Sequence, residues 1–188
     1  MHVFSRPSFA APAQVIQAVP RFTPGTALDA PGGPRPVETL SRGDLVDTPD
    51  GPREVASVGL RSVAREDWTY RRELWPIRVP VGSLGNAVPL RLVAGQRVLL
   101  RGRALEAEMG VVELWVSVGA LIGLRGLALD RPLGALRQHG LTLAGDAAGA
   151  VRVAGVWCEL AERGHEPDRD AVRAAFVAMN AAGEPRLA

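Results

Sequence analysis

The chain has 188 residues, 47% of them apolar, which suffices for one hydrophobic core of ordinary size and leaves little for a second. Its formal charge is only +2, and its 22 basic residues are all arginines scattered among acids, so nucleic acid is not an expected partner. The single cysteine, Cys158, excludes an intramolecular disulfide and a cysteine-based metal site.

Neither a secretory leader nor a membrane helix is evident in the sequence. The first residues are interrupted by Arg6, Pro7 and Pro12 before an apolar run develops. The most apolar region, 114–129, is broken by glycines and by Arg125, and falls short of the ~20 apolar residues that span a bilayer. We therefore expect a soluble, cytoplasmic protein with no membrane partner.

Residues 1–19 have no clear hydrophobic period and are interpreted as an N-terminal tail, with at most a short strand through Val15 and Ile16. From residue 20 to residue 163, short apolar runs alternate with turn signals, which predicts one domain of short strands. The strands are expected at 55–60, 77–79, 90–92, 98–100, 111–116 and 141–143, the last pairing toward 151–157.

Turn residues punctuate these strands. Asp50-Gly51 and Gly145-Asp146 tolerate positive φ, as tight hairpins require. Pro36, two residues before Glu38, favours a single helical turn that leads into the next strand.

The last segment, 164–188, is predicted to contain one amphipathic helix and a tail. Asp168 is a candidate N-cap, and the run Gly-Glu-Pro at 183–185 is a stop signal. We expect the helix to close over a sheet edge, with dimerisation as the less favoured alternative. Its apolar residues fall on one face: Ala171, Val172, Ala175, Phe176 and Met179.

Several blocks follow one another in the order and spacing of a known family. Phe22-Thr-Pro-Gly-Thr26 is followed by Pro36-Val-Glu-Thr-Leu40 and by Gly43-Asp-Leu-Val46, and further blocks lie at 76–79, 82–85, 96–100 and 154–157. Over about 21–162 the sequence resembles bacterial Hint (hedgehog/intein) domains. The resemblance implies a mostly β fold, a compact horseshoe-like disc of short strands, followed here by one C-terminal helix.

Hint domains cleave themselves, and the resemblance implies where the reacting residues would stand. A cysteine normally precedes the Phe-Thr-Pro-Gly-Thr run and attacks the carbonyl before it, which turns the peptide into a thioester. Here that position is Arg21, whose guanidinium stays protonated and offers no nucleophilic electron pair.

The family also carries a Ser/Thr-x-x-His block, in which the hydroxyl polarises the scissile amide and the imidazole protonates the departing nitrogen. The corresponding residues are Val93 and Gln96, and glutamine has no titratable proton near neutral pH. A downstream Asp-x-His block reads Asp146-Ala-Ala148. These departures predict a degenerate member in which Arg21 and Gln96 still lie within about 10 Å of each other and the Gln96 amide bonds to backbone or solvent.

Other candidates for chemistry have simpler explanations. Cys158 lies in the predicted final strand and is expected to be a buried hydrophobe. His2, His139, in a loop after Gln138, and His165 lack metal-ligand spacing, so we interpret them as surface residues and expect neither a metal nor a cofactor. Asp44 is expected to tie down backbone N–H groups in a turn.

The segment 65–75 is the most distinctive surface candidate, because it mixes charged residues with tryptophan and tyrosine. Aromatic residues and arginine are over-represented at binding hot spots. An excursion that packs its own tryptophans onto the disc is an equally weighted alternative. The candidate binding residues are Arg65, Trp68, Tyr70, Arg71, Arg72 and Trp75.

Two functions remain open. We favour a non-catalytic Hint-like domain that binds a protein partner or itself, as a binding or scaffolding module, because the nucleophile and the acid are both replaced. The alternative is an autoprocessing protein that performs an N–S or N–O acyl shift with an unrecognised nucleophile. Thr23 and Thr26 are nearby hydroxyls, but each is displaced along the chain from the bond to be attacked.

Overall fold

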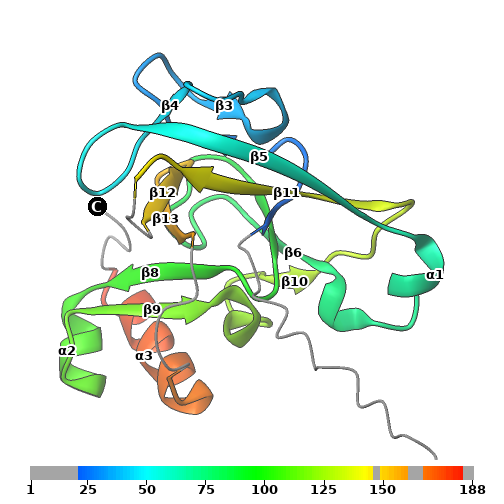
Figure 1. The fold of residues 1–188 in the computed structure, drawn as a ribbon. Coiled ribbons are helices and arrows are strands. Elements are labelled where there is room, and N and C mark those ends of the chain that lie inside the picture. The colour runs from blue at the N-terminus through cyan, green and yellow to red at the C-terminus, as the bar shows by residue number, and fades with distance from the viewer. Residues whose placement is uncertain (1–20, 146–148, 161–166, 184–188) are drawn as a thin grey trace, which may run out of the picture.

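The computed structural model describes residues 21–145, 149–160 and 167–183, and short strands dominate it (Figure 1). The strands are β1 Arg21–Phe22, β2 Ala27–Leu28, β3 Arg35–Pro36, β4 Leu45–Val46, β5 Arg53–Val63, β6 Pro76–Val79, β7 Leu90–Val93, β8 Arg97–Arg101, β9 Glu113–Ser117, β10 Ala128–Leu129, β11 Leu136–Leu143, β12 Ala150–Val153 and β13 Val156–Glu159. The α-helices are α1 Arg65–Trp68, α2 Arg103–Met109 and α3 Arg169–Ala181, and the 3-10 turns are η1 Val37–Thr39, η2 Arg72–Leu74 and η3 Val118–Leu121.

Within the described residues the strands form a seven-stranded and a six-stranded antiparallel sheet. The first has the order β10-β6-β7-β1-β11-β5-β4, and the second has the order β3-β2-β12-β13-β8-β9. The expected mostly β fold with one C-terminal helix is therefore confirmed.

The longest ladder joins β5 and β11, which pair from Val63 opposite Leu136 to Val55 opposite Leu143. α1 follows directly after β5 and lies at the far end of this ribbon (Figure 1). At the other end, the predicted turn at Gly51, with a φ of 102°, returns β4 into β5. The ribbon thus carries the segment 65–75 away from the centre of the domain.

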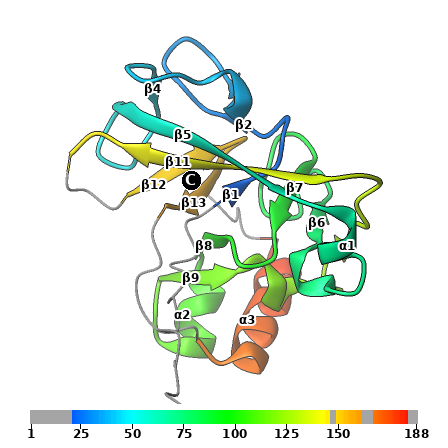
Figure 2. The same ribbon diagram turned by 45° about the vertical axis from the view of Figure 1, so that its right-hand side comes forward.

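The helix α3 closes one side of the molecule, where it packs beside α2 and below β8 and β9 (Figure 2). Its predicted cap is confirmed, since the Asp168 carboxylate accepts a hydrogen bond of 2.9 Å from the Ala171 N–H. Its apolar face joins the main core, which also contains residues of both sheets. The buried residues of α3 are Val172, Ala175, Phe176 and Met179.

The expected pairing of 141–143 with 151–157 is wrong. β11 pairs with β1 and β5, whereas β12 pairs with β13 and β2. The reason lies at Ala154 and Gly155, whose φ angles of 48° and 91° form a two-residue hairpin between β12 and β13. This short connection pairs β12 locally and leaves β11 to the other sheet.

The expected surface loop at His139 is also wrong. His139 lies within β11, opposite Phe22 of β1 and Leu60 of β5, and is buried. The residues after Gln138 continue the ladder with β5, so the expected loop is the middle of a strand. His2 and His165 lie outside the described residues, as do Val15 and Ile16.

The helix α2 was not predicted. Its residues from Ala104 to Met109 are good helix formers, and Gly110 ends it with a φ of 71°. The signal was therefore present in the sequence. In the part of the chain that the structure describes, no helix has the length and apolar character needed to cross a bilayer.

Candidate functional site

The topology brings the backbones of Arg21 and Val93 side by side. β1 pairs with β7 through Phe22 opposite Leu92, so the antiparallel register places Arg21 opposite Val93. The Thr23 hydroxyl donates to the Arg91 carbonyl at 2.8 Å, which agrees with this register. Neighbouring strands lie about 4.8 Å apart, so these two backbones are adjacent.

Gln96 belongs to the same place, because its N–H donates to the Val93 carbonyl at 2.9 Å and closes the turn between β7 and β8. The three positions that the resemblance singled out, Arg21, Val93 and Gln96, therefore converge despite their separation in the sequence. The fourth, Ala148, lies outside the described residues.

The Gln96 side chain is only 1% exposed and is held by the backbone. Its Nε2 donates to the carbonyl of Glu159 at 2.8 Å and to that of Arg97 at 3.1 Å. Its Oε1 has no hydrogen-bond partner among the described residues. The amide is thus used to tie β8 to β13, as expected for a glutamine that bonds to backbone.

Arg97, the next residue, makes a second connection between β8 and β13. Arg97 donates through Nη1 to the Glu159 carboxylate at 3.0 Å and through Nη2 to the Trp115 carbonyl at 3.0 Å. Both side chains of this ion pair are about nine-tenths buried. Sequence inspection did not find the pair, because residues 62 positions apart are joined only by the fold.

The threonine hydroxyls near the site have structural partners. Thr23 and Thr26 are buried, and their Oγ1 atoms lie 3.2 Å apart. The Thr23 hydroxyl also donates to the Arg91 carbonyl. Among the described residues, neither threonine hydroxyl hydrogen-bonds to a histidine, so this arrangement offers no general base.

Cys158 is fully buried in β13, as predicted, opposite Val98 of β8. Burial raises the pKa of its thiol far above the usual value, and the nearby charge of Asp29 raises it further. The reactive thiolate is therefore scarce near neutral pH. Within 21–145, 149–160 and 167–183, no three His, Cys, Asp or Glu side chains gather to form a metal site.

Asp44 has the structural role expected of it. Its carboxylate accepts from the Ser41 N–H at 2.7 Å and pairs with Arg35 at 2.6 Å. The hydrogen bond from Arg35, followed by that from Ser41, lowers the pKa of this carboxyl below its usual value. Glu38 likewise fixes a turn, since it accepts from the Gly25 N–H.

The segment 65–75, the candidate binding surface, has a buried part and an exposed part. Trp68 is buried, donates through Nε1 to the Gly134 carbonyl at 2.9 Å, and packs edge-on against Trp75 with ring centroids 6.4 Å apart. Trp75 donates through Nε1 to the Trp68 carbonyl at 3.0 Å. The two tryptophans therefore form a small core of their own with Val63.

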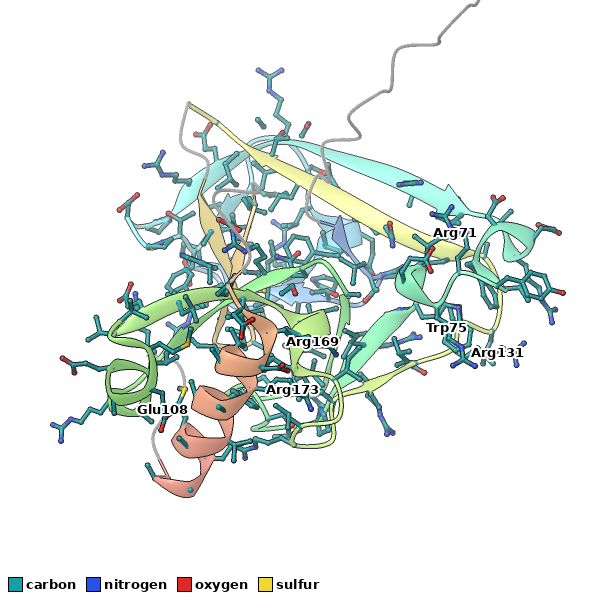
Figure 3. All side chains as sticks on the ribbon, turned by 90° about the horizontal axis from the view of Figure 1, so that it is seen from below. Arg71, Trp75, Glu108, Arg131, Arg169 and Arg173 are labelled. Atoms are coloured by element: carbon teal, nitrogen blue, oxygen red, sulfur yellow. The ribbon has the colours of Figure 1, made fainter. Side chains whose placement is uncertain are left out.

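The other candidates face outward. Tyr70 is 92% exposed, Arg65 is exposed, and Arg71 pairs with Glu73 at 2.9 Å. The candidate Arg72 places its guanidinium about 6 Å from the Trp75 ring centre, and so does Arg131, which the sequence did not single out. Figure 3 shows Trp75 and Arg131 next to each other at the end that carries α1. A hollow of about 370 Å³ lies there, and we call it the aromatic–arginine pocket; it is lined by Thr69, Tyr70, Arg72, Trp75 and Arg131.

Comparison with known proteins gives a family and a fold. The family model described as "Hint domain" matches residues 20–165. The bacterial intein-like domain of Clostridium thermocellum matches with a TM-score of 0.51 and 12% identity, over 76% of this chain and 99% of that domain. The MchDnaB-1 intein matches with a TM-score of 0.44 and 13% identity, over 73% of this chain and 98% of the intein. No curated protein sequence matches significantly.

Proposed function

Because the chain belongs to the Hint domain family, we propose that it is a Hint domain that does not cleave itself and acts as a protein-binding module. The proposal that the chain does not cleave itself rests on the convergence of Arg21, Val93 and Gln96 on one place in the fold. A guanidinium, an alkyl group and an amide supply neither a nucleophile nor a titratable acid there.

The state of Gln96 supports this proposal. Its amide nitrogen is engaged by two backbone carbonyls, those of Arg97 and Glu159, so the side chain acts as a structural tie. A general acid would need a proton to give to the departing nitrogen, and an amide does not give one.

No substitute nucleophile is favoured by its surroundings. Cys158 is buried with a raised pKa, and the Thr23 hydroxyl is committed to a backbone carbonyl. Both groups would have to leave their partners or their burial before attacking a peptide carbonyl.

The test of the first half is the intact mass of freshly purified full-length chain after incubation with hydroxylamine or dithiothreitol. We expect one species of unchanged mass. A time-dependent fragment ending at Pro20 would show that the chain performs the acyl shift after all, and the proposal would fail.

The protein-binding half rests on the exposed side of the segment 65–75. Tyr70 is 92% exposed although it follows the fully packed Trp68, and two arginines lie over Trp75 beside it. A rigid aromatic platform with arginines is the composition of a binding hot spot. A photo-crosslinking residue at position 70 should therefore give discrete protein adducts in a cell extract, whereas one at position 42, which is also exposed, should give none.

A further inference from the structure

The aromatic–arginine pocket has a rigid floor. The Trp75 indole is fixed by its hydrogen bond to the Trp68 carbonyl and by its edge-on contact with the Trp68 ring. Trp68 is in turn fixed by its hydrogen bond to the Gly134 carbonyl, which ties 65–75 to the chain between β10 and β11. A ligand at this pocket would therefore meet a surface that is already ordered.

Two arginines, Arg72 and Arg131, lie against the Trp75 ring. Arg72 lies 5.8 Å and Arg131 lies 6.0 Å from the Trp75 ring centroid. Neither guanidinium pairs with a carboxylate or donates a hydrogen bond within the described residues. The acidic residues next to them in the sequence form ion pairs with other arginines. Glu73 pairs with Arg71, and Asp130 pairs with Arg91.

The chemistry of the two arginines indicates the ligand. Stacking on an indole holds a guanidinium in place and leaves the donors on its rim free. Two such cations line the same pocket and attract an anion, and a carboxylate accepts charge-assisted hydrogen bonds from guanidinium groups. The pocket, of about 370 Å³, has room for a side chain or two and not for a large cofactor.

The exposed residues around the pocket indicate that the ligand carries apolar side chains as well as a carboxylate. Tyr70, which lines the pocket, is 92% exposed. An exposed aromatic side chain in a pocket with two arginines suits a peptide in which acidic residues alternate with apolar ones. A nucleic acid fits less well, because Glu66 and Asp67 of α1 are exposed on the same segment and would repel phosphates.

We propose that the aromatic–arginine pocket binds an acidic, apolar-containing segment of another protein, with Arg72 and Arg131 pairing to its carboxylates and Tyr70 covering its apolar side chains. This inference rests on the proposed protein-binding function and names the class of partner.

The test uses the full-length chain and two fluorescein-labelled peptides, one alternating glutamate with phenylalanine and one with glutamine in place of every glutamate. Fluorescence anisotropy should detect binding of the glutamate peptide, weakened in about 0.5 M salt, and binding of the glutamine peptide at least about tenfold weaker. The double variant Arg72→Gln/Arg131→Gln should lose at least about tenfold in affinity for the glutamate peptide. Arg42→Gln, which removes an exposed arginine elsewhere, should not, and equal thermal midpoints for the two variants would show that both are folded.

Four results would overturn the inference. They are no binding of the glutamate peptide up to about 1 mM at low salt, equal affinity for the glutamine peptide, unchanged affinity in the double variant, and tighter binding of a single-stranded oligonucleotide that the double variant also loses. These results leave the mass test of self-cleavage unaffected. Conversely, a fragment ending at Pro20 would refute the proposed function without bearing on the charge preference of the pocket.

Discussion

Arg97 and Glu159 form an ion pair of 3.0 Å that joins the start of β8 to the end of β13 with only 10% of each side chain exposed. The register of the sheet explains it, because Cys158 pairs with Val98 and so places Glu159 opposite Arg97. Gln96 donates to the backbone of the same glutamate. Glu159 of the last strand thus binds both Gln96 and Arg97 at the candidate site.

This pair predicts a large cost for removing either partner. Glu159→Gln should lower the free energy of unfolding by about 3 kcal/mol, because it leaves a buried guanidinium without its counter-charge. Urea denaturation measures the difference. The matched control is Glu113→Gln on the same sheet, which breaks the half-exposed Arg101–Glu113 pair and should cost about 1 kcal/mol or less. Equal costs for the two variants would contradict the structural role of the Arg97–Glu159 pair.

The convergence of Arg21 and Gln96 predicts that chemistry can be returned to the site. In Arg21→Cys/Gln96→His, the introduced thiol attacks the Pro20 carbonyl carbon, and the amide bond breaks as the introduced imidazole protonates the departing nitrogen. Hydroxylamine should then release residues 1–20, about 10²-fold faster than from Arg21→Cys alone. Mass spectrometry follows the fragment over time.

The control for this experiment is Arg21→Ala/Gln96→His, which has the acid without the nucleophile and should stay intact. Equal rates for the single and the double cysteine variants would show that residue 96 does not reach the scissile bond. The shared placement inferred from the β1–β7 register would then be wrong.

The buried face of α3 predicts that this helix contributes to global stability. Phe176→Ala should lower the free energy of unfolding by about 3 kcal/mol or more, because its ring is fully buried in the main core. The adjacent Val177 is 51% exposed, and Val177→Ala should change stability by less than about 1 kcal/mol. Chemical denaturation of both variants makes the comparison, and a small effect of Phe176→Ala would mean that α3 unfolds separately from the domain.

The lowered pKa of Asp44 predicts a pH dependence. Because Arg35 and the Ser41 N–H favour the ionised carboxylate, folding gains stability from it at pH values above its usual pKa of 3.8. This gain is lost as the pH falls through the lower pKa of the folded state. The difference in thermal midpoint between wild type and Asp44→Asn should therefore be largest near neutral pH and shrink below pH ~4. Asp50→Asn, at a mostly exposed position, should show no comparable trend.

Sequence patterns predicted what depends on local order. The helix α3 followed from its one apolar face and the Asp168 cap, and the hairpin at Gly51 followed from its turn residues. The family resemblance pointed to Arg21, Val93 and Gln96 as one site, which no local pattern contains, and the structure places both Arg21 and Gln96 beside Val93. The helix α2 was overlooked although its composition indicated it.

What the sequence did not reveal depends on contacts between distant segments. His139 was expected in a loop, but it lies in β11 between β1 and β5 and is buried, and the residues around it do not tell which distant strands it pairs with. Arg131 was missed for the same kind of reason, since only the fold brings it to Trp75. The wrong pairing of β11 came from overlooking the two-residue hairpin at Ala154 and Gly155.

The helix α3 has a consequence for what a break in the chain would do. It lies beyond the residues matched by the family model, yet Phe176 and Met179 sit in the core and Arg173 donates to the Ala120 and Ile122 carbonyls. We therefore expect that a cut between Leu160 and Pro167 would yield two polypeptides that stay associated. The helix would remain bound through its buried side chains, as one fragment of a split protein binds its complement.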